Sequence, residues 1–152
     1  MTATAMPAAE RMSDTVAWRP FPGFDGLYYW VLSVDRSTDV VDMLMKFDPN
    51  AKCVPHRHVG PTRTLVIEGE HILFEPEDPT AATSRKIAGQ LGTNDGDEQH
   101  IEGGGPNGAV ILLTMTAVDA VVYEIFDDSL TLDRTITLDD FERGLRKQQA
   151  PA

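Results

Sequence analysis

Two histidines stand one residue apart in the stretch VPHRHVGPTRTLVIEGEH, which covers residues 54–71. The chain has four histidines, and three of them, His56, His58 and His71, fall within this stretch. Imidazole nitrogens commonly bind divalent metal ions, with bonds of about 2 Å. Pairs of this kind also occur on protein surfaces without any metal. Whether this pair can bind a metal therefore depends on the conformation of the segment that carries it.

An extended segment would place both imidazoles on one side. Side chains alternate between the two faces of a strand, so residues two apart share a face, with Cα atoms about 6–7 Å apart. His56 and His58 then converge on one ion, whereas Arg57 faces the opposite side. Cys53 has the parity of Arg57, which argues against a Cys-x-x-His site unless a bend at Pro55 reverses it.

A third ligand has to come from elsewhere in the chain. His100 follows a turn-rich stretch, and Glu98 shares its parity. In an antiparallel barrel, residues 56–58 and 98–100 can lie on neighbouring strands, which would bring His100 and Glu98 to the first pair. His71 is expected to be a surface or hydrogen-bonded strand histidine. Whether Glu98 or His71 completes a metal shell stays open.

Runs of β-branched and aromatic residues, each followed by turn residues, predict that the chain is mostly β. The expected strands cover residues 26–35, 40–47, 63–75, 85–91, 108–117 and 120–127. Residues 63–75 form either two strands around a turn at 68–70 or one strand with a bulge at Gly69. Residues 75–84 are expected to be a loop, and 103–106 a turn next to the histidines.

The C-terminal segment departs from the strand pattern. Thr137 and Asp140 have the spacing of a capping box, and Phe141 and Leu145 then share one helical face. A helix is expected there. Many short strands followed by one terminal helix predict an all-β fold class, a single small antiparallel β-barrel with a C-terminal helix.

The length of 152 residues fits one domain. We expect a domain at residues 15–150 behind a disordered tail at 1–14, which lacks the basic start and apolar stretch of a signal peptide. No apolar run approaches the about 18 residues of a transmembrane helix. Cys53 is the only cysteine, which suits a reducing compartment, so we expect the cytoplasm.

The charge of the chain argues against two classes of partner. Lys and Arg total 13 against 24 Asp and Glu, for a formal net charge of −11. Nucleic-acid binding relies on Lys and Arg at the phosphates, and an anionic membrane surface also repels an acidic protein. We therefore expect no nucleic acid and no membrane as a partner, and a small-molecule substrate instead.

The residues HRHVGPTRTLVIEG resemble the first motif of the cupin superfamily, in which His-x-His precedes a turn and a strand that closes on glycine, here Gly69. The resemblance is closest to the branch of acetylacetone-cleaving dioxygenases and anti-sigma-factor cupin domains. His100 takes the place of the second motif's histidine, although Gly96 is one residue out of register. Asn50 replaces the first motif's opening glycine, and Asn tolerates left-handed backbone.

One departure concerns the carboxylate of the first motif. The superfamily usually has a glutamate four or five residues after the second histidine, where this chain has Thr62 and Arg63. Residue by residue, the resemblance therefore implies three metal ligands, His56, His58 and His100. It also implies a double-stranded β-helix of the jelly-roll type, a divalent metal (Fe(II) first, zinc or nickel possible) and a homodimer.

The function implied by the resemblance is a metal-dependent dioxygenase that cleaves a carbon–carbon bond in a diketone-like or other chelating substrate. Glu98 would be a ligand, a partner behind a ligand or a base, and Arg63 would bind an anionic substrate if it faced inward. Three alternatives stay open. They are an isomerase or lyase using zinc or nickel, a non-catalytic sensor or regulatory module that binds a metal or ligand, and a metal-free scaffold.

Overall fold

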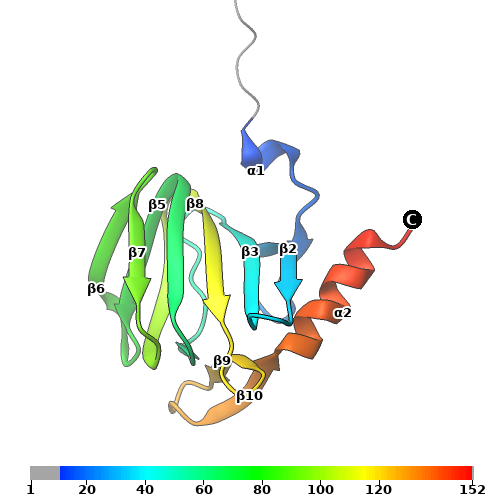
Figure 1. Cartoon of the computed structure of the whole chain (residues 1–152). Coiled ribbons are helices and arrows are strands. Elements are labelled where there is room, and N and C mark those ends of the chain that lie inside the picture. Colours follow the sequence, from blue (N-terminus) through cyan, green and yellow to red (C-terminus); the bar gives the residue numbers. More distant parts are fainter. Residues whose placement is uncertain (1–10, 152) are drawn as a thin grey trace, which may run out of the picture.

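Most residues of the computed structural model, which describes residues 11–151, lie in β-strands (Figure 1). The elements in chain order are α1 (Met12–Thr15), β1 (Arg19–Pro20), β2 (Leu27–Asp35), β3 (Val40–Phe47), β4 (His56–His58), β5 (Thr62–Glu75), β6 (Asp78–Ile87), β7 (Leu91–Asn94), β8 (Glu98–Thr116), β9 (Val121–Phe126), β10 (Leu132–Thr137) and α2 (Leu138–Gln149). No helix among these residues is long and apolar enough to cross a membrane.

Strand β8 organises the sheet because it pairs with three other strands. Its first residues pair with β4, its second half pairs with β3, and β5 follows it along both halves. Beyond these neighbours, β4 pairs with β9 and β9 with β10, while β2 extends the sheet next to β3. All these pairs are antiparallel, and Figure 1 shows β9 and β10 crossing below the larger sheet. The predicted all-β antiparallel barrel with a C-terminal helix is confirmed.

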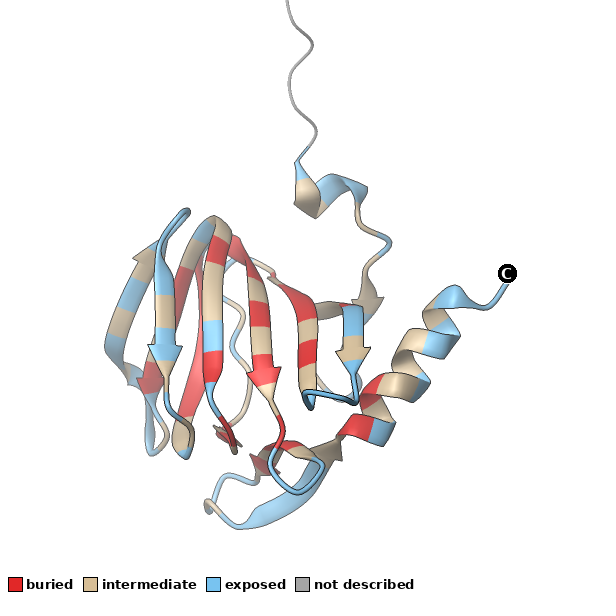
Figure 2. Cartoon of the chain, in the orientation of Figure 1, coloured by how far each residue is buried: buried red, intermediate tan, exposed pale blue. Residues whose placement is uncertain are grey.

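The core lies inside the curled sheet. Val41 and Ile111 are fully buried there, at 0% exposure, and many of the buried positions in Figure 2 lie on strands β3 and β8. Each such side chain contributes about 1.5–3 kcal/mol on leaving water. Trp30 and Leu44, which alternate with core residues, face the outside of the same sheet. The core therefore fills one face of β2, β3 and β8 and fixes which side chains point into the barrel.

Helix α2 closes one side of the barrel and begins at the predicted capping box. The Thr137 side chain accepts a hydrogen bond from the Asp140 backbone N–H, and the Asp140 carboxylate accepts one from the Thr137 N–H at 2.8 Å. Phe141 is buried in the core, as the helical pattern predicts. Near the other end of the helix, the Gln148 side chain exchanges two hydrogen bonds of 2.8 and 2.9 Å with the Val31 backbone.

Several local expectations are wrong or need refinement. Residues 75–84, expected to be a loop, belong mostly to β6, and residues 103–106, expected to be a turn, lie inside β8. Strand β10 was not expected at all. Residues 63–75 form one strand with register irregularities on both sides of Gly69, which is the bulged alternative. Of the expected tail, residues 1–10 lie outside the described residues, and Met12–Thr15 form α1.

The glycines at 103–105 allow β8 to pass through a crowded corner of the barrel. A Cβ added at Gly103 would lie 2.9 Å from the Ala51 carbonyl oxygen, and one at Gly105 would lie 2.9 Å from the Glu70 Cβ. Real Cβ atoms essentially never approach backbone or rigid neighbours so closely. These glycines therefore allow neighbouring segments to pack closely against β8, and the chain does not turn there.

Candidate metal centre

Strand β4 presents its two histidines to the interior. His56 and His58 are 7% and 3% exposed, whereas Arg57 between them faces outward and forms ion pairs with Asp97 and Glu124. The register of β4 on β8 places His56 opposite His100, which is 6% exposed. Strand parity thus positions two histidines, and strand pairing brings the third beside them.

The ring nitrogens of these histidines converge on one place. His56 Nε2 lies 3.2 Å from His58 Nε2 and 3.1 Å from His100 Nε2. Glu102, two residues after His100 on β8, adds its Oε2 atom at 2.8 Å from His56 Nε2. All four ligand atoms lie within 4.8 Å of one another, and all four residues are buried.

These separations match a shared divalent ion. With metal–ligand bonds of about 2.0–2.2 Å, neighbouring ligand atoms in tetrahedral or octahedral geometry lie about 3–3.5 Å apart. Without an ion, the Nε2 atoms of the three buried histidines crowd together around one carboxylate oxygen. The group of His56, His58, His100 and Glu102 can therefore bind a metal, and its donor set fits iron, zinc and nickel.

Further contacts hold these ligands from behind. His56 Nδ1 donates to the Val54 carbonyl oxygen at 3.1 Å, which leaves the Nε2 lone pair free to face the metal position. His71 Nε2 donates to Glu102 Oε1 at 2.9 Å, so that Oε2 is the carboxylate oxygen directed at the histidines. Glu98 Oε1 lies behind His100 at 3.3 Å from its Nδ1, an ion-pair distance without hydrogen-bond geometry.

The electrostatics of the metal-free cluster follow from burial and these contacts. Burial lowers the pKa of His58 to about 4, so this ring is neutral near neutral pH. Burial also opposes the charge on Glu102, but interactions with His100 and His56 outweigh it and hold the carboxyl pKa well below its usual range. Burial likewise opposes the charged forms of His56 and His100, yet nearby Cys53 and Glu102 raise the pKa of His56, and Glu102 and Glu98 raise that of His100.

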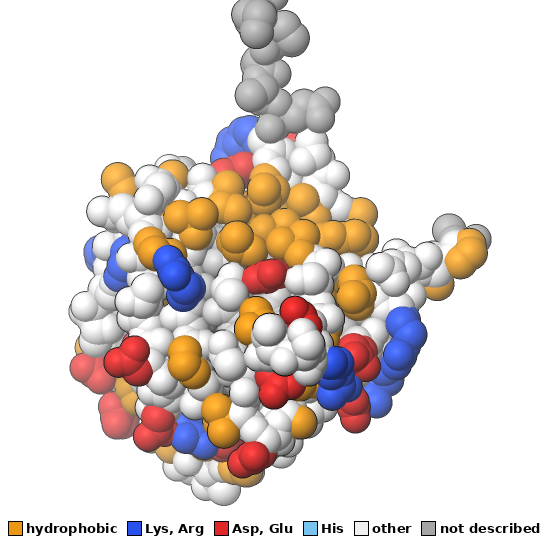
Figure 3. Space-filling model, in the orientation of Figure 1, with side chains coloured by type: hydrophobic (Ala, Val, Ile, Leu, Met, Phe, Trp, Pro, Cys, Tyr) orange, Lys and Arg blue, Asp and Glu red, His pale blue; other side chains and the backbone are white. Residues whose placement is uncertain are grey.

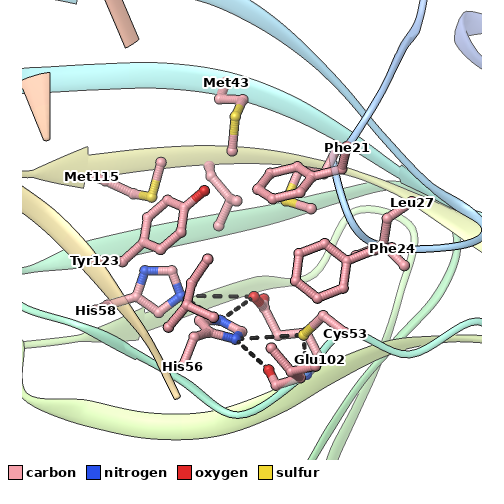
Figure 4. A pocket seen from close by; sticks show the side chains of 14 residues that line it. Phe21, Phe24, Leu27, Met43, Cys53, His56, His58, Glu102, Met115 and Tyr123 are labelled. Carbon is pink, nitrogen blue, oxygen red and sulfur yellow. Dashed lines mark hydrogen bonds and ion pairs between the residues drawn. The ribbon is translucent and has the colours of Figure 1, made fainter. Parts of the chain in front are cut away.

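Two cavities reach the cluster, and we name them by their chemistry. The apolar cavity, shown in Figure 4, is lined by His56, His58 and Glu102 together with Phe21, Phe24, Leu27, Met43, Met45, Cys53, Val54, Leu113, Met115, Tyr123 and Ile125. The polar chamber is lined by His58, Thr62, Thr64, His71, Leu73, Thr83, Ser84, Lys86, Gly92, Thr93, Asn94, Glu98, His100 and Glu102. His58 and Glu102 thus lie between an apolar and a polar space.

Tyr123 is the aromatic residue nearest the histidines in the apolar cavity. Its ring centroid lies 6.2 Å from that of His56 and 6.1 Å from that of His58. Burial raises the pKa of this phenol, so Tyr123 keeps its proton near neutral pH. In Figure 4 its oxygen points into the cavity, where it is a neutral hydrogen-bond donor.

The structure brings together some of the predicted site residues and separates others. His56, His58 and His100 meet, and Glu98 lies behind His100 rather than in the cluster. Arg63 does not face inward as the anionic-substrate hypothesis required. It is exposed, because β5 directs its neighbour Thr62 toward the interior.

Cys53 is not part of the cluster. Its Sγ atom lies 3.4 Å from His56 Nδ1, on the side of the ring away from the other ligands, and it accepts a hydrogen bond from the Glu102 N–H at 3.2 Å. The cysteine is therefore packed behind two of the cluster residues.

Two departures from the sequence motif are explained by the structure. Asn50 has φ +61°, the left-handed geometry that a glycine would otherwise provide. The missing first-motif glutamate has a counterpart in Glu102, which comes from β8 instead of β5. Its signal in the sequence was the parity that it shares with His100 and Glu98.

The barrel has the cupin fold, which solved cupin-like structures share with this chain. Within that fold class, the chain belongs to the family of ChrR cupin-like domains, whose model matches residues 9–118. A search among curated proteins found no match.

Three solved structures illustrate the shared fold. An acetylacetone dioxygenase from Acinetobacter johnsonii has a TM-score of 0.70 at 16% identity, covering 97% of this chain and 95% of that chain. An RmlC-like cupin protein from Ralstonia eutropha JMP134 has a TM-score of 0.68 at 14% identity, covering 87% and 81%. Rhodobacter sphaeroides SigE in complex with the anti-sigma ChrR gives a TM-score of 0.54 at 22% identity, covering 68% and 50%. At these identities, the similarity establishes the fold.

Proposed function

We propose that the protein is an Fe(II)-dependent dioxygenase that cleaves a carbon–carbon bond in a small diketone-like or other chelating oxygenated compound. The observation that carries this proposal is the convergence of His56, His58, His100 and Glu102 at a buried point that two cavities reach. Four protein ligands leave about two positions of an octahedral ion open, which suits a substrate that chelates through two oxygens. The similarity in fold to an acetylacetone dioxygenase supports the same reaction class.

The bound ion would supply Lewis acidity and reactivity with dioxygen. The protein's own residues orient the reactants and control protons. His71 fixes the direction of Glu102 through a hydrogen bond, Glu98 places a negative charge behind His100, and Phe21 and Phe24 keep water out of the apolar cavity. Glu98 also lines the polar chamber, where its carboxylate can accept the proton that a diketone loses on becoming an enolate.

Oxygen consumption tests this proposal. Metal-free protein is reconstituted separately with Fe(II), Zn(II) and Ni(II), and a panel of β-dicarbonyl compounds is added in an oxygen-electrode cell. We expect one O₂ consumed per substrate cleaved, with Fe(II) alone, and no consumption by the His58→Ala variant. If the iron-loaded protein consumes no oxygen with any compound although the metal is bound, the dioxygenase assignment is wrong.

A second candidate is a regulatory module that binds a metal or ligand without turnover. The match to the ChrR cupin-like family, together with the similarity in fold to a complex of SigE with the anti-sigma ChrR, favours it. The same experiment separates the candidates, because a regulatory module binds metal and diketone but consumes neither oxygen nor substrate. Turnover without oxygen in the zinc or nickel protein would identify an isomerase or lyase instead.

The cytoplasmic location stays a prediction.

We further propose that the protein forms a homodimer through the outer face of its larger sheet. Trp30, Leu44, Leu112, Leu65 and Leu91 are successive cross-strand neighbours from β2 to β7 and form an apolar row on this face. Figure 3 shows hydrophobic side chains gathered over β2, β3 and β8. Apolar patches of this kind commonly mark protein interfaces.

Sedimentation velocity at micromolar concentration tests the dimer. We expect Leu91→Glu to shift the protein to monomer, because Leu91 is 45% exposed at the end of the apolar row. Leu132→Glu is the matched control, since Leu132 is similarly exposed, at 51%, but lies on β10. A monomeric wild-type protein, or equal effects of both variants, would rule out this interface.

A further inference from the structure

The polar chamber contains a lysine whose charge has no acidic partner. Lys86 on β6 is half-buried and donates a 2.8 Å hydrogen bond from Nζ to the Ser84 hydroxyl. Its side chain lies over Gly92, where an added Cβ would lie 3.3 Å from Cε and 3.7 Å from Nζ. Within residues 11–151, no carboxylate oxygen lies within 4.0 Å of this ammonium group. Arg85, the next residue toward the N-terminus, faces outward and pairs with Glu70 at 2.7 Å.

The two carboxylates that line the polar chamber already have partners. Glu102 accepts a hydrogen bond from His71 and belongs to the metal-binding group, and Glu98 lies beside His100. Lys86 therefore faces a chamber whose two carboxylates are already engaged, and the contact given for its ammonium group is the neutral Ser84 hydroxyl. An anionic group of a bound molecule would complete its interactions, because ammonium and carboxylate form strong charge-assisted hydrogen bonds.

A second donor lines the same chamber. Asn94 Oδ1 accepts the Gly96 N–H at 2.9 Å, which fixes the amide so that its NH₂ group remains available. Among the described residues, none accepts a hydrogen bond from that NH₂ group. The hydroxyls of Thr64 and Thr93 add further polar lining. Lys86 and Asn94 therefore offer two donor groups in a chamber that His58, His100 and Glu102 also line.

We propose that the substrate of the metal centre carries a carboxylate, and that Lys86 and Asn94 bind this carboxylate in the polar chamber while the substrate's carbonyl oxygens face the histidines. The substrate class is then a small oxo acid with a chelating diketone or keto–enol group. This inference deepens the proposed function and rests on it. It assigns to Lys86 the role that the sequence pattern had suggested for Arg63, which lies on the outside of β5.

Two probes isolate the carboxylate. Pentane-2,4-dione and 2,4-dioxopentanoate share the same chelating diketone, but only the second carries a carboxylate. Their dissociation constants are measured by calorimetry on the Zn(II)-loaded protein, where no oxidation occurs. We expect wild-type protein to bind 2,4-dioxopentanoate about 10- to 100-fold more tightly than pentane-2,4-dione, because one charge-assisted hydrogen bond contributes about that much to affinity.

Variants at position 86 assign the preference to the lysine. In Lys86→Met we expect the preference to fall to within about threefold, with binding of the neutral dione unchanged, and in Lys86→Arg we expect most of it to remain. Arg85→Met is the matched control, because it removes the same charge from the outer side of the same strand. It should keep the wild-type preference.

The outcomes separate this inference from the proposed function. Equal binding of the two probes by wild-type protein, or a preference that survives in Lys86→Met, would overturn the carboxylate site while leaving the metal centre intact. A preference lost equally in Arg85→Met would also overturn it, because the effect would then come from net charge. Failure of zinc-loaded wild-type protein to bind either diketone would refute the chelating function, and the inference with it.

Discussion

Replacing Glu102 by Gln tests whether the metal shell has three protein ligands or four. Glu102 is 3% exposed, with Oε2 at 2.8 Å from His56 Nε2 and Oε1 accepting from His71 Nε2 at 2.9 Å. Glutamine keeps the shape but has only one acceptor oxygen. If that oxygen faces the histidines, the NH₂ group meets the His71 donor, and if it faces His71, the NH₂ group points at the metal position. Either orientation loses one contact, and both lose the negative charge.

The expected loss of metal affinity depends on where each carboxylate lies, because Glu102 belongs to the ligand group whereas Glu98 lies behind a ligand. Removing a partner behind a ligand typically lowers metal affinity about 10- to 100-fold. Glu102 lies in the ligand group itself, so we expect Glu102→Gln to weaken Zn(II) binding by at least about 100-fold, or about 2.7 kcal/mol. Glu98→Gln makes the same chemical change behind His100, at 3.3 Å from its Nδ1, and should weaken binding by about tenfold, the lower end of that range, because the Glu98 side chain is 37% exposed.

Competition with a chromophoric chelator measures these affinities. The visible spectrum of the Co(II)-loaded proteins reports the change in ligand number, and circular dichroism verifies that each variant is folded. Should Glu102→Gln retain affinity within a few-fold of wild type while Glu98→Gln loses as much or more, Glu102 is not a ligand. A neutral three-histidine shell would then be correct.

Three further predictions concern the ligands, their protons and helix α2. His58→Ala should abolish tight Zn(II) binding whereas Cys53→Ala should not, as measured by metal content after purification, and the opposite pattern would refute the ligand assignment. Because the pKa values of His56 and His100 are raised in the metal-free protein, metal must displace their protons, so affinity should rise with pH and calorimetric heats should depend on the buffer. A pH-independent affinity would contradict this. Thr137→Ala removes the capping box and should lower the free energy of unfolding by about 1 kcal/mol in thermal denaturation, whereas an unchanged Tm would show the cap to be dispensable.

The histidine cluster was predictable because it depends on strand geometry alone. Alternation fixes the common direction of His56 and His58, and pairing of two antiparallel strands brings His100 to them. Glu102 obeys the same alternation but was missed, because the Gly-Gly-Gly-Pro run after it suggested a turn. The glycines instead serve close packing, and β8 continues through them. Local composition did not reveal that neighbouring strands crowd this segment.

Strand β6, most of which the sequence did not predict, lacks an apolar face. Strand β6 carries DPTAATSRKI, in which no alternation of apolar residues stands out, and it pairs only with β5 among the described strands. Edge strands tolerate polar residues and proline, as at Pro79, so their composition resembles that of a loop. Lys86 lies in the part of β6 that was predicted to be a strand, but its direction toward the polar chamber depends on how that strand pairs with β5. The direction of Arg63 required the register of β5, which one strand's sequence does not determine.

The crowded glycine corner of β8 has a mechanical consequence. The strand is held tightly at Gly103–Gly105, between the segment that carries His100 and the segment that carries Ile111. Because β8 cannot bend at these glycines, a displacement of one end of the strand also moves the other end. Opening motions that admit a molecule to the interior must come from the flanking pieces, such as β6–β7 or the Phe21–Phe24 segment, and amide hydrogens along this part of β8 should exchange among the slowest in the protein.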